Sequence, residues 1–184
     1  MTLTVDENGK PFYNVSVDDS LLIENSAMGF TAANGIILSE GFQVKNTTFS
    51  SEDETWTQPW GENKKNRNHY NEMAVSLTNE DQVQLTLRFR VFDDGIGFRY
   101  EYTVPTVDSL LITDELTTFR FHRDGTSWSI PASAETYELL YQQQPISEVE
   151  TANTPFTFKT ADGVYGSIHE AALYDFPEMT LKQI

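Results

Sequence analysis

The stretch "QVQLTLRFRVFDDGIGFRYEYTV", residues 82–104, contains the clearest structural pattern in the sequence. Its first half places Val83, Leu85, Leu87, Phe89 and Val91 on one face, with glutamine, threonine and arginine between them. After "DDG" at 93–95 the alternation resumes at residue 96, with Ile, Phe, Tyr, Tyr and Val at every second position. A period of two is typical of a half-buried strand, and an Asp-Gly turn joins antiparallel neighbours. The stretch therefore predicts a long β-hairpin.

The same pattern recurs along the chain. Strand, turn and strand are predicted in "LTVDENGKPFYNVSV" (3–17) and in "FTFKTADGVYGSI" (156–168), and glycines break short strands in 20–51. Residues 132–141 predict at most a short helix or turn, and 142–154 is the most loop-like stretch. Short strands with turn signals every ten residues or so favour an all-β fold, a β-sandwich. A chain of 184 residues suits one domain, or one large domain that has been cut.

The composition limits the classes of function. Hydrophobic residues make up 39% of the chain, with 12 Phe and 8 Tyr, which indicates a packed core. The formal net charge of -16 disfavours nucleic acid and anionic membranes as partners. The acidic residues keep the protein soluble, or else they form a cation site or attract a partner electrostatically. The chain has no cysteine, no apolar run long enough for a spanning helix and no leader pattern after Met1.

The stretch "TWTQPWGENKKNRNHYNEM" (55–73) has the composition of a sugar-binding site. Indole rings stack on pyranose faces, and amides and carboxylates bind hydroxyl groups. The alternative is a long inter-strand loop in which tryptophan is an anchor and the polar residues are solvated. Trp60, Glu62 and Asn71 are the candidate substrate-binding residues, and both interpretations stay open on composition alone.

The segment "HEAALYDFPEM" (169–179) offers carboxylates to a hard cation such as calcium. Glu170 alone supplies at most two of the six to eight oxygens that calcium takes, so an acidic surface turn is the alternative. Whether Asp175 or Glu178 assists Glu170 stays open. No nucleophile elbow or phosphate loop is present, and sequence cannot select a catalytic pair among 28 acids. No catalytic residue is assigned, and the three histidines lack zinc-ligand spacing.

Four segments together resemble glycoside hydrolase family 97. They are "DENGKPFYNVSVDDSLLIENSAMGF" (6–30), "SEDETWTQPWGENKKNRNHYNEM" (51–73), "LRFRVFDDGIGFRYEY" (87–102) and "IHEAALYDFPEM" (168–179). Their order and spacing agree with the first domain of that family, and the resemblance covers almost the whole chain.

The resemblance implies an N-terminal β-sandwich of the galactose-mutarotase type, here incomplete and cut before a catalytic (β/α)8 barrel and a small C-terminal β domain. Family members are exo-acting α-glucosidases or α-galactosidases, usually exported to the periplasm of Bacteroidota. The barrel carries the catalytic carboxylates, by an inverting or a retaining mechanism. A calcium ion in the active site binds barrel glutamates and one glutamate of the sandwich, which the match places at Glu170.

These implications define the expected partners and activity. The domain packs on its own barrel and helps to shape the pocket for an oligo- or disaccharide, and alone it hydrolyses nothing. The loop with Trp60, Glu62 and Asn71 is expected near the interface or the rim of the cleft. Exposed interface surface would favour self-association of the fragment. Two other classes of function stay open. One is a free-standing carbohydrate-binding module, and the other is a structural or adhesive β-domain that binds neither calcium nor sugar.

Overall fold

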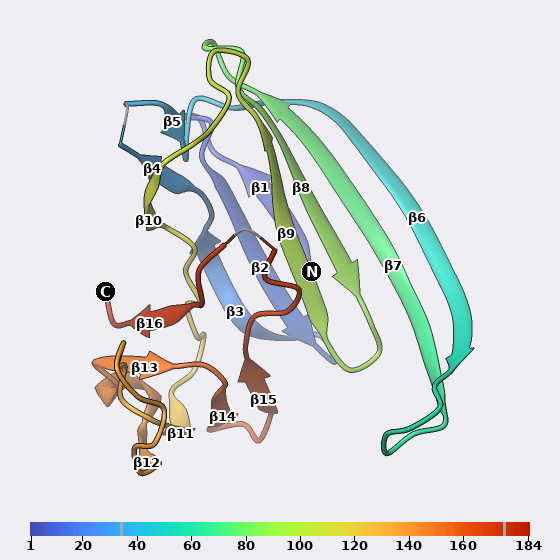
Figure 1. Ribbon diagram of the computed structural model, residues 1–184, viewed down its shortest axis with the longest axis vertical. Helices are drawn as coiled ribbons and strands as arrows, with labels where there is room; N and C mark the ends of the chain where they lie inside the picture. The colour runs from blue at the N-terminus through green and yellow to red at the C-terminus, as the bar shows by residue number, and fades with distance from the viewer. Residues whose placement is uncertain (34, 175) are drawn as a thin grey trace. The chain divides into compact units, whose positions relative to one another are not determined.

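The computed structural model describes residues 1–33, 35–174 and 176–184, and it divides the chain into two compact units. The first unit comprises Met1–Arg120 and the second Phe121–Ile184. Both are built from antiparallel strands (Figure 1). Among the described residues the one helical element is a short 3-10 turn, η1, at Ile146–Glu148. None of the described residues forms a helix long and apolar enough to cross a membrane. The all-β prediction is confirmed.

The described residues of the first unit form three sheets. The largest has the order β6-β7-β8-β9, with bounds Gln43–Thr57, Lys65–Thr78, Gln84–Val91 and Ile96–Thr103. A second sheet joins β1 (Thr2–Val5), β2 (Pro11–Val17) and β3 (Ser20–Ala27). A small third sheet has the order β10-β4-β5, formed by Ile112–Glu115, Phe30–Ala32 and Ile37–Leu38. The hairpins predicted over 3–17 and 82–104 are therefore confirmed as β1–β2 and β8–β9.

Aromatic side chains join the two larger sheets of this unit face to face. The Tyr13 ring of β2 lies 6.5 Å from that of Phe89 in β8 and 5.5 Å from that of Phe98 in β9. Phe89 is fully buried and Tyr13 nearly so, and the Tyr13 hydroxyl donates to the Thr118 carbonyl at 2.7 Å. Burial raises the pKa of Tyr13 far above its ordinary value. The apolar face that the alternation predicted is thus the core face of a sandwich.

The opposite face of the large sheet carries an ion network. Arg88 bridges Glu72 at 2.5 Å and Glu101 at 3.0 Å, Arg90 adds a contact to Glu72 at 2.8 Å, and Arg99 one to Glu101 at 2.6 Å. Hydrogen bonds from Arg90 and Arg88 hold the pKa of Glu72 below its usual range, and those from Arg88 and Arg99 do the same for Glu101. The network therefore stabilises the fold only while both carboxyls are ionised.

This network predicts a defined pH dependence of stability. Since the folded-state pKa values of Glu72 and Glu101 are depressed, their contribution is present above the ordinary value near 4.5 and is lost as the pH falls through the lowered values. The free energies of unfolding of Arg88→Met and wild type, measured with urea, should differ most near neutral pH and converge as the pH falls through the lowered pKa values. Lys45→Met, the control, removes one positive charge from β6. Its difference from wild type in free energy of unfolding should not change over this pH range. A constant difference between Arg88→Met and wild type at every pH would contradict the assignment.

The stretch 55–73 is not a long loop, which corrects the interpretation of it as an inter-strand loop. β6 and β7 pair without interruption from Asn46↔Ser76 to Thr57↔Lys65, so only residues 58–64 connect them. β8 pairs with β7 only from Asn71 onward. The outer part of the β6–β7 hairpin is therefore a two-stranded arm that reaches past the β8–β9 turn (Figure 1). Every residue of β6 is exposed.

The second unit holds a sheet of order β12-β11-β14-β15, with bounds Gln142–Pro145, Gly125–Ser129, Phe156–Thr160 and Tyr165–Ile168. A two-stranded sheet pairs β13 (Thr151–Asn153) with β16 (Thr180–Lys182). The hairpin predicted over 156–168 is confirmed as β14–β15. The loop predicted over 142–154 is wrong, because this stretch contains β12, η1 and β13. Residues 132–141 are irregular, with bends and no helix.

Packing in the second unit centres on phenylalanine. Phe121 lies edge-on to Phe158 with 4.7 Å between ring centroids, and Phe156 and Phe158 are both buried. Phe158 of β14 is opposite Gly166 of β15, and a Cβ on that glycine would meet the Phe158 ring at 2.4 Å. The missing side chain at residue 166 thus makes room for the ring, which fixes the register of the hairpin that leads to Glu170.

Candidate functional site

Strand register brings Glu170 next to Thr154. In the β14–β15 hairpin, Phe156 is opposite Ile168. Because the strands are antiparallel, the residues that follow Ile168 lie beside the residues that precede Phe156. Glu170 comes two residues after β15 ends, and Thr154 lies between β13 and β14. The chain then returns through residues 171–179 to β16, which pairs with β13.

Two hydrogen-bond donors hold the Glu170 carboxylate. The Thr154 hydroxyl donates to Oε2, and the Met179 backbone N–H donates to Oε1 at 3.0 Å. Burial is the largest single influence on the pKa of Glu170 and raises it. The hydrogen bonds from Thr154 and Met179, with smaller contributions from the backbone of Glu170 itself and from His169, together outweigh burial and hold this pKa below its usual range. The carboxylate is therefore ionised near neutral pH and oriented by its partners.

A hollow of about 540 Å³ opens at this carboxylate, lined by Tyr137, Thr154, Pro155, His169 and Glu170. Tyr137 is 49% exposed, and its hydroxyl donates to Glu178 Oε2. That bond raises the pKa of Tyr137 to about 12, with a smaller contribution from the charge of Glu170. His169 Nδ1 lies 3.0 Å from the Glu170 carbonyl oxygen. The hollow thus combines a fixed carboxylate with an aromatic wall.

Large apolar side chains are exposed on two segments of the second unit, of which the first contributes Tyr137 to the hollow. One segment is 132–141 and the other is 171–179, and the Tyr137–Glu178 hydrogen bond joins them. A group of exposed apolar side chains of this size is more typical of an interaction surface than of a surface that stays in contact with solvent. We call these residues the apolar rim: Leu139, Leu140, Tyr141, Leu173, Tyr174 and Phe176.

The donors around Glu170 fit calcium as one part of a site. A carboxylate is the hard oxygen ligand that calcium prefers, and each oxygen of Glu170 keeps a lone pair beyond its one hydrogen bond. Within 1–33, 35–174 and 176–184, no group of three or more His, Asp or Glu side chains could hold a metal ion. Glu178 is bonded to Tyr137, and Asp175 lies outside the described residues. Calcium at Glu170 would need further ligands from elsewhere.

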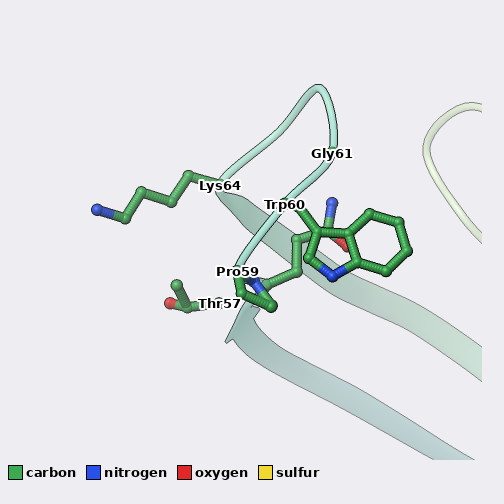
Figure 2. Close-up of a pocket in the computed structure, with 6 residues that line it drawn as sticks. Thr57, Pro59, Trp60, Gly61 and Lys64 are labelled. Atoms are coloured by element: carbon green, nitrogen blue, oxygen red, sulfur yellow. The ribbon is translucent and has the colours of Figure 1, made fainter.

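The Trp60 candidate lies at the tip of the β6–β7 arm, in the first unit. The side chain of Gln58 closes the loop by donating to the Asn63 carbonyl at 2.9 Å. Trp60 is 83% exposed and borders a hollow of about 500 Å³ with Gln58 and Lys64. Figure 2 shows the indole ring on one side of the loop and the Lys64 side chain directed to the other. Glu62 is exposed in the same loop.

Asn71 is not brought together with these two residues. It lies in β7 opposite Ser51 and Val91, six positions beyond Lys65 at the end of the arm. At the rise of a β-strand this places Asn71 about 20 Å along β7 from Lys65. The structure therefore separates the three predicted substrate-binding residues: Trp60 and Glu62 lie at the tip of the arm, and Asn71 lies at its base, where β7 also pairs with β8.

Sequence reasoning missed Thr154 and Tyr137. Thr154 lies two residues before β14, and Glu170 lies two residues after β15. The register of the predicted 156–168 hairpin could therefore have shown that the two residues are neighbours. Tyr137 is 41 residues from Glu178, and no local pattern signals that contact.

Comparison with known proteins identifies the domain. The family described as Glycosyl-hydrolase 97 N-terminal matches residues 1–184, and the chain belongs to this family. A retaining alpha-galactosidase of Bacteroides thetaiotaomicron is 23% identical over 92% of the chain. A family 97 enzyme of Pseudoalteromonas sp. strain K8, solved in complexes with panose and with acarbose, is 36% identical over the whole chain with a TM-score of 0.90. The predicted sandwich fold and family are confirmed.

The chain spans only part of these relatives. It covers 27% of the Bacteroides protein and 28% of the Pseudoalteromonas chain. In the relatives this domain is thus one part of a larger family 97 enzyme that also has a catalytic domain. A beta-arabinopyranosidase, 24% identical over 86% of the chain with a TM-score of 0.74, shares the fold.

Proposed function

We propose that this domain packs on the catalytic barrel of an exo-acting α-glycosidase and gives Glu170 to a calcium ion in the active site. The observation that carries the proposal is the Glu170 carboxylate, ionised and held by two donors at the edge of a hollow. The apolar rim supports the packing, because such a surface is stabilised when a neighbouring domain covers it.

The substrate and the compartment belong to the same proposal. The names of the relatives support an α-linked glucoside or galactoside as substrate. The general acid and the base or nucleophile lie on the barrel, so the domain itself is inactive. The parent enzyme acts in the periplasm of a bacterium of the Bacteroidota.

Within this proposal the chain's own residues bind and orient. Glu170 would supply one carboxylate ligand, and Thr154 and Met179 would set its direction. Bound calcium supplies a positive charge that orients the substrate and stabilises developing negative charge. Pro155 and the ring of Tyr137 would exclude water from one side of the site.

Calcium removal tests the proposal in the complete enzyme. Hydrolysis of nitrophenyl α-glucoside and α-galactoside should be lost on treatment with EDTA and restored by added calcium, because the ion is part of the active site. The 184-residue chain alone, the control, should be inactive with or without calcium. Full activity of the complete enzyme after exhaustive chelation would contradict a catalytic calcium site.

A free-standing carbohydrate-binding module is the second candidate, favoured by the exposed Trp60 beside its hollow at the arm tip. The first proposal places Trp60 and Glu62 near the domain interface or the rim of the cleft, with Asn71 further along the arm. It therefore predicts no measurable affinity of the isolated chain for maltose or melibiose in calorimetry. Saturable binding that Trp60→Ala removes and Trp56→Ala retains would establish the module instead.

A further inference from the structure

We propose that Thr154 and Tyr137 are positioning residues that hold Glu170 in the orientation in which it binds calcium. This inference rests on the proposed function, since it assumes that Glu170 is a calcium ligand. It goes further because it assigns roles to residues that lie outside the "HEAALYDFPEM" segment. It follows from two connected sets of contacts within the second unit.

The first contact is direct. The Thr154 hydroxyl donates to Glu170 Oε2, and strand pairing fixes Thr154 in turn, because it lies between β13 and β14. The preceding residue, Asn153, is buried, and its side-chain amide donates to the Ser133 carbonyl at 3.4 Å. The donor that orients Oε2 is thus attached to the rigid part of the unit.

The second contact acts through the segment 171–179. Met179 N–H donates to Glu170 Oε1, and the residue before it, Glu178, accepts the hydrogen bond of the Tyr137 hydroxyl. Between Glu170 and Met179 the described residues form no strand, so this segment lacks a hydrogen-bonded ladder of its own. The Tyr137–Glu178 bond therefore fixes the peptide that presents the Met179 N–H.

Both contacts leave Glu170 with the lone pairs that a cation needs. Oε1 and Oε2 each accept one hydrogen bond, and each has a second acceptor position. Substitution of a group that orients a metal ligand typically lowers metal affinity about 10–100-fold. Without Thr154 and Tyr137 the carboxylate would lose its donor at Oε2 and the contact that fixes its donor at Oε1, so calcium binding would have to order it.

Calcium affinity of the complete enzyme, measured by titration calorimetry, tests the inference. Thr154→Val keeps the shape of the side chain and removes the hydroxyl donor. Tyr137→Phe removes the hydroxyl group of a half-exposed residue. Each substitution should weaken calcium binding about tenfold or more. Thr154→Ser restores a hydroxyl and should recover most of the affinity. Thr157→Val on β14 and Tyr165→Phe on β15 are the matched controls, with affinity unchanged.

A second readout needs no metal. Amide hydrogen exchange at Met179 in the 184-residue chain should accelerate about tenfold in Tyr137→Phe, the factor that corresponds to one ordinary hydrogen bond. Tyr165→Phe should leave it unchanged. Unchanged exchange in Tyr137→Phe would overturn the role of Tyr137 even if every variant folds.

The outcomes separate this inference from the proposed function. If Glu170→Gln weakens calcium binding while Thr154→Val and Tyr137→Phe do not, the positioning inference is wrong and the proposed function stands. If Glu170→Gln has no effect on calcium binding, the assignment of Glu170 fails and the inference fails with it. Loss of affinity in all three variants, with recovery in Thr154→Ser, supports both.

Discussion

Glu170→Gln in the complete enzyme is expected to weaken calcium binding by at least about 100-fold, because even groups that only orient a ligand account for about 10–100-fold. The substitution replaces a charged oxygen ligand by a neutral amide of nearly the same shape. The amide keeps one oxygen that can accept from the Met179 N–H, and its NH2 group can donate to the Thr154 hydroxyl oxygen, so the fold should persist while the charge is lost. Calorimetric titration with calcium measures the affinity, and turnover at saturating substrate should fall in parallel.

A matched control isolates the site from the overall charge. Glu148→Gln removes the same charge from η1 in the same unit, at an exposed position. Its calcium affinity and turnover should equal those of wild type. If Glu170→Gln matched wild type as closely as Glu148→Gln does, the assignment of Glu170 would be wrong.

The second large effect concerns the core of the first unit. Phe89→Ala should lower the free energy of unfolding by about 3–5 kcal/mol, the usual cost of removing a buried phenylalanine ring. Phe89 is fully buried, and its ring contacts those of Tyr13 and Phe98 at 6.5 Å and 5.8 Å. Loss of this ring leaves a cavity where the two sheets meet.

Urea unfolding followed by circular dichroism measures this effect. Phe49→Ala is the matched control, because Phe49 lies in β6 of the same sheet and is 75% exposed. Its effect should stay within about 0.5 kcal/mol. Equal destabilisation by the two substitutions would mean that Phe89 is not the central contact between the sheets.

Hydrophobic alternation predicted the parts of the fold that bury one face. The β8–β9 hairpin places Leu87 and Phe89 inward and Arg88 and Arg90 outward, so its period of two is visible in the sequence. β6 is exposed along its whole length, and the outer half of β7 has no third strand beside it. Nothing forces apolar residues into alternate positions there, so the strands of 55–73 resembled a loop.

The candidate site likewise combines a residue that the sequence singles out with partners that it does not. Glu170 is a candidate ligand only through the resemblance of "IHEAALYDFPEM" to the family, and its hydrogen-bond partners could not be predicted from the sequence. Thr154 is brought to it by the register of β14 and β15, and Tyr137 by a contact across 41 residues. Such contacts depend on tertiary structure, which local spacing does not encode. The separation of Asn71 from Trp60 likewise follows from the long pairing of β6 with β7.

The most direct test of a shared calcium site is a crystal structure of the complete enzyme with calcium bound, in which anomalous scattering locates the ion. The account predicts a Glu170 carboxylate oxygen within about 2.3–2.6 Å of calcium, with the remaining ligands from the barrel and water. It also predicts that Thr154 and Met179 still donate to that carboxylate. Calcium coordinated by barrel residues and water alone, with Glu170 outside its ligand sphere, would contradict the central claim.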